Sequence, residues 1–261
     1  MDGLGWRARF GILVIHNDPV PETELWAMAP PGVTFHTARF ESPRKPGADY
    51  AGDAAAALEG SPDVARGLQQ LGSMPLDAIC VCWTSGSFFG GTSFDDSFSR
   101  QATVAAGGIP VLLAATAMTG AMAALGVTRP MVVMPPWFPP AVVEAAVDYL
   151  RASGVDPLGP ARFDLGEGWR HMPTYETYDR GAHWTVRPED LYRQVRQSFP
   201  GEADGVLIPG SAMRTLAAIE SLEHDLGVPV ITANQASLWS CLRAARTRVS
   251  VPGFGQLLRA L

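Results

Sequence analysis

The chain has 261 residues, of which 47% are hydrophobic and 18% are charged, so it can bury a large core and whole-chain disorder is excluded. The formal net charge of −6 argues against a nucleic-acid partner. Only three cysteines occur, which excludes a disulfide scaffold and favours a reducing, cytoplasmic location. No zinc-site spacing, GxGxxG or Walker A pattern is present, so no metal and no cofactor is expected.

Short apolar runs of β type alternate with alanine-rich helical stretches. The runs are apolar on both faces, which suits a parallel sheet covered by helices on both sides. The alternation therefore predicts an α/β, doubly wound fold. The predicted strands are residues 10–15, 78–82, 110–114, 131–134, 205–208 and 228–232. The predicted helices are residues 50–58, 62–71, 94–106, 118–125, 141–152, 188–198, 212–226 and 235–246.

The longest uncharged stretch lies between Arg100 and Arg129, and its length would permit a membrane span. It contains Gly107, Gly108 and Pro110, and it divides into IPVLLAATA followed by TGAMAALGV. A buried strand followed by a packed helix explains this pattern better, so no membrane partner is expected. The first ten residues also lack the apolar run of a signal peptide.

An internal repeat relates the two halves of the chain. Residues 77–85 match 204–212, residues 108–112 match 227–231, and residues 11–14 match 131–134 more weakly. The three matches keep the same order at an offset of about 120 residues, which predicts two similar α/β lobes. Ligands of open α/β sheets bind outside the carboxyl ends of the strands. The residues that follow each strand are therefore expected to line a cleft between the lobes.

Two turns rich in hydroxyl groups follow the repeat-related strands. The first contains Thr84 and Ser85, and the second contains Ser211 after Gly210. Hydroxyl and backbone N–H groups at such turns can hold a carboxylate or an enolate oxygen. A simple helix cap is the alternative for each turn. Their symmetric placement favours ligand binding, because one small ligand could be held from both sides.

Other polar residues are weaker candidates. Asn234 follows the last predicted strand and either orients a ligand or caps the next helix. Asp18 follows the first strand and is an acid/base candidate, although a simple turn before a proline is the alternative. His171 lies in the aromatic segment 166–184, which is typical of a lid or binding loop. Cys82 is the cysteine nearest to the predicted cleft, and a buried structural role is its default interpretation.

Three segments resemble a known family. Residues 204–244, which contain VPVITANQASLW, resemble the C-terminal segment of the aspartate/glutamate racemase superfamily. The most similar branch contains the maleate cis-trans isomerases, the arylmalonate decarboxylases and ectoine-utilisation protein A. Residues 76–91 (LDAICVCWTSGSFFGG) are similar to the first-lobe motif of this branch, and residues 115–127 to its connecting helix. The resemblance covers most of the chain and is weakest between residues 156 and 187.

The resemblance implies two flavodoxin-like lobes with pseudo-twofold symmetry, a cofactor-free site between them, and a homo-oligomer as the family-level expectation. It also implies one cysteine per lobe, at the ends of the two repeat-related strands. This chain has Trp83 and Gly210 at those positions, so neither family cysteine is present. A two-cysteine racemase and cysteine addition to a double bond are therefore disfavoured. Decarboxylation needs only an oxyanion cradle, an apolar pocket and one proton donor.

These observations assign the candidate roles. The cradle residues are Thr84, Ser85 and Ser211, the apolar wall is Trp83 and Trp137, and Gly210 and Asn234 complete the substrate-binding set. The proton-donor candidates are, in descending order, Ser211, Asp18 and His171. The first lobe is expected to comprise residues 1–116 and 236–261, and the second lobe residues 117–235.

The predicted function is that of a cofactor-independent isomerase or lyase, which acts on a small carboxylate or dicarboxylate held between the lobes. A catalytically silent carboxylate-binding relative is the alternative, because both cysteines are missing. Water addition or ester hydrolysis, with Asp18 or a histidine of segment 166–184, is a third interpretation. The absence of a GxSxG motif argues against it.

Overall fold

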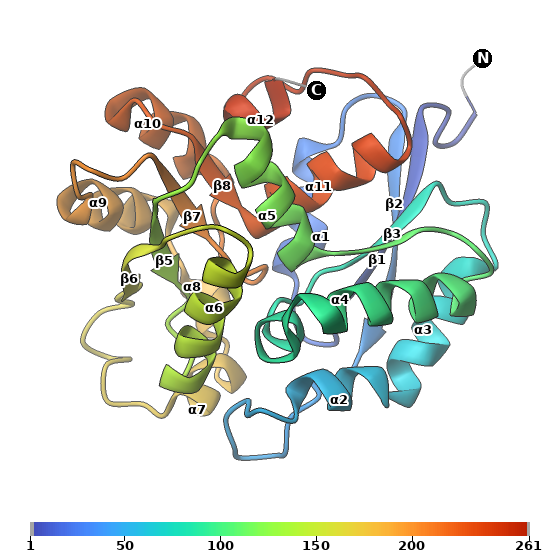
Figure 1. The fold of residues 1–261 in the computed structure, drawn as a ribbon, viewed down its shortest axis with the longest axis horizontal. Coiled ribbons are helices and arrows are strands. Elements are labelled where there is room, and N and C mark those ends of the chain that lie inside the picture. Colours follow the sequence, from blue (N-terminus) through green and yellow to red (C-terminus); the bar gives the residue numbers. More distant parts are fainter. Residues whose placement is uncertain (1–2, 260–261) are drawn as a thin grey trace.

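The computed structural model describes residues 3–259 and contains two four-stranded sheets, in which every strand pair is parallel. The first sheet has the order β2-β1-β3-β4 and the second has the equivalent order β6-β5-β7-β8 (Figure 1). The strands of the first sheet are β1 (Ala8–Ile15), β2 (Val33–Phe40), β3 (Ala78–Val81) and β4 (Val111–Leu113). Those of the second are β5 (Pro130–Met134), β6 (Leu158–Arg162), β7 (Gly205–Ile208) and β8 (Val230–Thr232). The predicted two-lobed α/β fold is confirmed.

Helices connect the strands and cover the sheets (Figure 1). Helices α1 (Val20–Met28), α2 (Ala54–Glu59), α3 (Pro62–Gly72) and α4 (Ser85–Ala105) connect strands of the first sheet. Helix α5 (Ala114–Leu125) leads to the second sheet, whose connections hold α6 (Pro140–Ala152), α7 (Thr174–Asp179), α8 (Ala182–Thr185), α9 (Pro188–Ser198) and α10 (Leu216–Leu226). Helices α11 (Ala233–Ala244) and α12 (Gly255–Arg259) follow the last strand. No helix within residues 3–259 is long and apolar enough to cross a bilayer.

The internal repeat is structural. Asp77 precedes β3, and its carboxylate accepts the backbone N–H of Arg9 at the start of β1, with an N···O distance of 2.7 Å. Asp204 precedes β7 and accepts the backbone N–H groups of Thr128 and Arg129, both at 2.8 Å, just before β5. The two aspartates therefore fasten the beginnings of equivalent neighbouring strands. The register agrees as well, because residue 11 lies opposite residue 79 and residue 131 lies opposite residue 206.

Two of the four edge strands, β2 and β6, were missed by the search for apolar runs. The sequence of β2 is VTFHTARF, in which polar residues interrupt the apolar ones. The sequence of β6 is LGPAR, and most of its residues are exposed. Glycine and proline weaken the pattern of a strand but are tolerated at a sheet edge. An edge strand has one unpaired side, so its sequence need not be continuously apolar.

Two helix starts differ from prediction for identifiable reasons. Helix α4 begins at Ser85 rather than residue 94, and the chain bends sharply at Gly91, where φ is +73°. Only glycine adopts this left-handed conformation readily. Helix α10 begins at Leu216 rather than residue 212, because residues 210–215 form a turn at the end of β7. Helix α1 and the short helices α7, α8 and α12 were not predicted.

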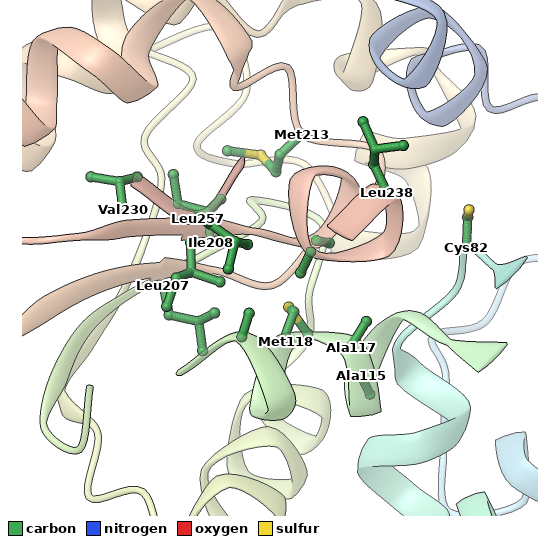
Figure 2. Packing of buried hydrophobic residues seen from close by; sticks show 14 of the residues in the cluster. Cys82, Ala115, Ala117, Met118, Leu207, Ile208, Met213, Val230, Leu238 and Leu257 are labelled. Atoms are coloured by element: carbon green, nitrogen blue, oxygen red, sulfur yellow. The ribbon is translucent and has the colours of Figure 1, made fainter. Parts of the chain in front are cut away.

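One buried hydrophobic cluster joins the two lobes. Figure 2 shows side chains of α5, β7 and α11 within it, with Cys82 at its side after β3. Helix α11 packs against α5 and also contacts β3 and β8, so it lies between the sheets. Helix α12 contacts α10 and β8, and the backbone N–H of Gln256 donates to the Glu223 carboxylate at 2.8 Å. This last helix therefore lies against the second sheet, whereas α11 also contacts α1 and β4 of the first lobe, and the expected lobe boundary at residue 236 stays a prediction.

Candidate functional site

A small cavity lies where the carboxyl ends of the two sheets meet. Its volume is about 30 Å³, which is the space of about one water molecule. Seven of the nine residues predicted from the sequence line it. The lining residues are Ile15, Asp18, Tyr50, Cys82, Trp83, Thr84, Ser85, Trp137, Phe138, Tyr178, Gly210, Ser211 and Ala212. Because the set includes residues after β1, β3, β5 and β7, both lobes contribute to this interlobe cavity.

Two hydroxyl groups of the interlobe cavity are candidate donors to a ligand. Ser211 Oγ is buried and has no hydrogen-bond partner within the described part of the chain. Ser85 is the first residue of α4, and backbone N–H groups of a first helical turn have no partner inside the helix. Thr84, at the N-cap, makes no side-chain cap to them. This end of α4 therefore offers N–H donors and a hydroxyl toward the interlobe cavity.

Thr84 does not act as the free donor that the sequence analysis expected. Its Oγ1 donates to the carbonyl oxygen of Pro209 at 3.0 Å, so its hydroxyl hydrogen is already used. Pro209 follows β7, whereas Thr84 follows β3. The bond therefore ties the equivalent strand ends of the two lobes together at the edge of the interlobe cavity. Neither this threonine nor Ser211 caps a helix with its side chain.

Asp18 is the buried carboxyl group of the interlobe cavity. Its Oδ1 accepts the backbone N–H of Val20 at 3.0 Å, so the predicted turn before Pro19 is present as well. Burial raises the pKa of Asp18 to about 7, against the opposing effects of the Val20 N–H and the positive charge of Arg39. Near neutral pH the carboxyl group therefore exists in both protonation states. Such a group can donate a proton and recover it at the same pH.

Aromatic rings from four separate parts of the chain form the walls. The ring of Trp83 lies 5.4 Å from that of Tyr50, and Trp137 lies 5.6 Å from Tyr178, between ring centroids. The hydroxyl of Tyr178 is buried and has no partner within the described residues. The substrate-binding set predicted from the sequence contained the two tryptophans but neither tyrosine. The aromatic character of segment 166–184 was the available signal for Tyr178, which α7 places in the cavity wall.

Two predicted site residues lie outside the lining of the interlobe cavity. His171 is exposed, because its loop precedes α7 and lies on the surface. Asn234 is buried in the first turn of α11, where its Nδ2 donates to the carbonyl oxygen of Ser211 at 2.8 Å. It caps no helix, since Thr232 and Gln235 form the capping box of α11. Asn234 thus contacts the lining residue Ser211 without itself lining the cavity.

Cys82 lines the cavity as a neutral thiol. Its Sγ lies 3.9 Å from the carbonyl oxygen of Cys80. The hydrogen bond with the Cys80 thiol, together with burial, raises the pKa of Cys82 well above its ordinary value. Cysteine nucleophiles act as thiolates, so this environment does not favour covalent chemistry at Cys82.

The structure shows different surroundings at the two positions where the resemblance implies cysteines. A Cβ atom built on Gly210 would lie 2.2 Å from Cγ of Pro135, so a cysteine does not fit without moving the proline ring. In the first lobe, Trp83 is buried and its ring fills the corresponding corner against Tyr50 and Phe40. A side chain at position 210 therefore requires the proline ring to move, and Trp83 occupies its corner of the cavity.

The fold and this site define a class: a two-lobed α/β protein with a polar cavity between the equivalent strand ends of its lobes. The family model for arylmalonate decarboxylase matches residues 55–258. The chain belongs to the arylmalonate decarboxylase family.

Similar proteins agree with this assignment. The chain is 29% identical over 206 residues to an arylmalonate decarboxylase from Bordetella bronchiseptica, a match that covers 77% of this chain and 78% of the relative. It is 30% identical over 159 residues to a maleate isomerase from Nocardia farcinica (strain IFM 10152), covering 60% and 58%.

Solved structures show the same fold. A maleate isomerase from Pseudomonas putida S16, crystallised with maleate, aligns over 97% of each chain with a TM-score of 0.81 at 23% identity. An unliganded arylmalonate decarboxylase aligns over 97% of this chain and 100% of its own, with a TM-score of 0.73 at 21% identity.

Proposed function

We propose that this protein is a cofactor-independent lyase or isomerase that acts on a small carboxylate in the interlobe cavity, and that its reaction is decarboxylation. One observation carries the proposal: a buried carboxyl group, Asp18, lines the same cavity as the hydroxyls of Ser85 and Ser211. The relatives named as decarboxylase and isomerases support the reaction class. A small malonate-type acid is the substrate class that this arrangement suits best.

Substrate binding would use donors from both lobes. Ser85, with the first N–H groups of α4, faces the cavity from the first lobe, and Ser211 faces it from the second. One carboxylate of the substrate would accept these hydrogen bonds. Hydrogen-bond donors that are fixed before the reaction stabilise negative charge as it develops on oxygen. The walls of Trp83 and Trp137 surround the other carboxyl group with apolar surface, where its charge is poorly solvated.

The chemical step needs one proton donor. The bond between the α-carbon and the poorly solvated carboxylate breaks and releases CO₂, and its electron pair moves into the remaining carboxylate as an enediolate. Ser85 and Ser211 stabilise the two oxygens of this intermediate. Protonated Asp18 then gives its proton to the α-carbon and forms the new C–H bond. The resulting Asp18 carboxylate takes up a proton from water before the next turnover.

This assignment changes the order of the donor candidates. Ser211 led the sequence-based order, but an unperturbed hydroxyl is a much weaker acid than a carboxyl group whose pKa is about 7. His171 is exposed and away from the lining. Asp18 therefore becomes the donor, and Ser211 takes the oxygen-binding role. Decarboxylation is favoured over isomerisation because it requires no attacking thiolate at position 83 or 210.

The walls of the interlobe cavity must open to admit a substrate. A volume of about 30 Å³ cannot contain a malonate. Tyr50 and Tyr178 belong to irregular or short segments around α2 and α7, whereas the hydroxyl-bearing residues follow core strands. Displacement of these two aromatic side chains is the smallest change that enlarges the cavity without moving Ser85 or Ser211.

Proton NMR in D₂O tests the proposal on the purified protein. The panel contains phenylmalonate, methylmalonate and maleate, with Asp18→Asn as the site variant and the exposed Asp53→Asn as its matched control. Loss of a carboxylate with deuterium at the α-carbon, abolished only in Asp18→Asn, is the expected result. Line broadening of a compound without any chemical change would instead identify the silent carboxylate-binding relative. Conversion of maleate alone would replace decarboxylation by isomerisation.

We also propose a cytoplasmic location and a homo-oligomeric assembly. The location is supported by three cysteines that are all free and buried thiols. The assembly is supported by large apolar side chains that the single chain leaves exposed, which include Trp6, Trp26 and Trp184. Light scattering during size-exclusion chromatography gives the number of copies directly.

A further inference from the structure

The turn between β1 and α1 carries Asp18, and side chains of other elements hold its main chain. The backbone N–H of Asp18 donates to the carbonyl oxygen of Ile15 at 3.0 Å, which closes the turn. The carbonyl oxygens of Ile15, His16 and Asp18 all accept from one guanidinium, that of Arg39 on β2. Arg39 does not line the interlobe cavity. The placement of the Asp18 carboxyl group in that cavity therefore depends on contacts made outside it.

Arg39 reaches this turn from the neighbouring strand. It lies opposite Val14 in the register of β1 and β2, one residue before β1 ends. Its Nη1 lies 3.1 Å from the carbonyl oxygen of Asp18, 3.3 Å from that of His16 and 3.4 Å from that of Ile15. Nη1 has two hydrogens, so the three contacts share them. Carbonyl oxygens that converge on one point repel each other, and the positive charge of the guanidinium offsets this repulsion.

Glu22 orients the guanidinium from α1. Its Oε2 accepts Nη2 of Arg39 at 2.5 Å, and its Oε1 accepts the hydroxyl of Thr37 at 2.7 Å. The side chains of Arg39 and Glu22 are 39% and 35% exposed, so the ion pair itself adds little to stability. Its effect is to leave Nη1 directed at the turn. The network thus fixes the turn of Asp18 more than it stabilises the fold.

Arg39 also supplies a positive charge to the surroundings of Asp18. Burial raises the pKa of Asp18 to about 7, the Val20 N–H and the charge of Arg39 oppose this rise, and Glu24 on α1 adds to it. The charge of Asp18 also acts on Cys82 and Tyr178, which line the same cavity. The hydrogen bond with the Cys80 thiol raises the pKa of Cys82, and burial raises that of Tyr178, so both are neutral near pH 7.

His183 holds the same turn from the second lobe without adding charge. Its Nε2 lies 3.2 Å from the carbonyl oxygen of Asn17, and a carbonyl can only accept, so Nε2 carries the hydrogen. Burial lowers the pKa of His183, which keeps the ring neutral near pH 7. On the exposed side of the turn, Nδ1 of His16 lies 3.2 Å from the carboxylate of Glu41. The turn is therefore fastened from both lobes, and Arg39 is its charged contact.

We propose that Arg39 is a positioning residue for Asp18, whose turn it fixes and beside whose carboxyl group it keeps a positive charge. The consequence for catalysis rests on the proposed function, in which Asp18 is the proton donor. A nearby cation favours the carboxylate form that remains after the proton has left. Arg39 would therefore help Asp18 to release its proton to the α-carbon, although it touches no substrate itself.

Carbon NMR of protein labelled at the aspartate carboxyl groups tests the charge effect without any reaction. The signal of Asp18 is assigned by its absence in Asp18→Asn. We expect Arg39→Gln to raise the titration midpoint of Asp18 from about 7 to about 7.5–8, because a partly exposed cation is removed. Arg39→Lys keeps the charge and should keep the wild-type midpoint. Arg66→Gln on α3 is the matched control, because Arg66 pairs with Asp63 at the surface.

Initial rates at pH 5 test the positioning effect separately from the charge. Asp18 is protonated at this pH in the wild type and in both Arg39 variants, so a rate difference reports its placement. We expect Arg39→Gln to lose about tenfold or more in kcat, since a small displacement of a reacting group is costly. Lysine lacks the planar fork that reaches the turn and Glu22 together, so Arg39→Lys should lose less than Arg39→Gln but more than Arg66→Gln.

The outcomes separate this proposal from the proposed function. A wild-type midpoint, or a wild-type kcat at pH 5, in a folded Arg39→Gln protein would overturn the proposal. If Arg39→Gln does not fold, Arg39→Lys decides it: a lower kcat with an unchanged midpoint supports the proposal, and a wild-type kcat overturns it. Absence of turnover in every protein, wild type included, would overturn the proposed function alone, and the NMR midpoint of Arg39→Gln would then decide whether Arg39 acts on Asp18.

Discussion

The side-chain amide of Asn234 holds the main chain at Ser211. Its Nδ2 donates to the carbonyl oxygen of Ser211 and to Oε2 of Glu24, both at 2.8 Å. Glu24 lies on α1 of the first lobe, and its other oxygen accepts the N–H groups at the start of α10 in the second lobe. A buried carboxylate of one lobe therefore fixes the turn of the other lobe that lines the interlobe cavity.

This relationship predicts that Glu24→Gln lowers the rate of turnover more than it lowers stability. The glutamine has the size of glutamate, and its oxygen can still accept the Thr215 N–H. Its new N–H₂ group faces the donor Nδ2 of Asn234, whose Oδ1 is without a partner in the described structure. If the Asn234 amide turns to present Oδ1, the Ser211 carbonyl loses its donor. A small displacement of a binding group costs about tenfold to a hundredfold in kcat.

Steady-state kinetics and thermal unfolding check this prediction together. Glu220→Gln on α10 is the matched control, because Glu220 pairs only with the exposed Arg259 among residues 3–259. We expect the control to retain its kcat, and Glu24→Gln to keep a KM within about threefold of wild type. A Glu24→Gln protein with wild-type kcat would show that this network has no part in positioning Ser211.

The protonation state of Asp18 should determine how activity depends on pH. The group donates its proton in the proposed reaction, so kcat/KM should fall as the pH rises through about 7, the pKa to which burial raises this carboxyl. Asp18→Asn should lose more than a hundredfold in kcat/KM, since proton transfer contributes about 10²–10⁴-fold. Initial rates between pH 5 and 9 measure both quantities. A wild-type profile that is flat across pH 7 would remove Asp18 from the donor role.

The same carboxyl group predicts a pH dependence of stability. Its pKa is about 7 in the folded protein and 3.8 ordinarily, so the folded state binds the proton more tightly. The favourable contribution is complete below pH 3.8 and is lost as the pH rises through about 7. The difference corresponds to about 4 kcal/mol of unfolding free energy. Urea unfolding of wild type and Asp18→Asn should therefore diverge above pH 4, with the variant more stable at pH 8.

The central strands could be predicted from the sequence because their positions in the fold require particular residue types. Buried parallel strands need apolar side chains on both faces, and Asp77 and Asp204 recur at equivalent strand starts. Residues that follow these strands, such as Ser85 and Ser211, could be placed at a common cavity by topology alone. The edge strands β2 and β6 were missed because polar or exposed residues interrupt their apolar pattern, whereas the edge strands β4 and β8 lie within predicted apolar runs.

The contributions of other segments could not be predicted in the same way. Tyr50, Tyr178 and Glu24 lie far in sequence from the strand ends that they reach, and each is placed by packing between elements. The role of Thr84 depended on a single bond to Pro209, which no spacing in the sequence reveals. The raised pKa of Asp18 likewise follows from burial in the folded protein, since its chain neighbour Val20 acts in the opposite direction.

Trp83 limits the space in the interlobe cavity. The side chain is buried, and its ring packs against Tyr50 and Phe40. Trp83→Ala should lower the unfolding free energy by about 3–5 kcal/mol, because it leaves a cavity in the first-lobe core. The same cavity should admit bulkier acids, so kcat/KM for phenylmalonate should rise relative to that for methylmalonate. Competition assays with both acids measure the ratio, and an unchanged ratio would show that this side chain does not set the size limit.

A side chain introduced at Gly210, the second expected cysteine position, should lower the stability of the protein. A Cβ atom there would meet Cγ of Pro135 at 2.2 Å, so the ring and the strand end that carries it must shift. Overpacking of this kind costs about 1–3 kcal/mol, and we expect that loss for Gly210→Ala in urea unfolding, with a further loss for Gly210→Cys. Gly168→Ala is the control, because a Cβ at Gly168 meets no atom within 4 Å. Its effect should stay within about 1 kcal/mol. If Gly210→Cys were as stable as wild type, the local packing would not explain why this chain lacks the second-lobe cysteine.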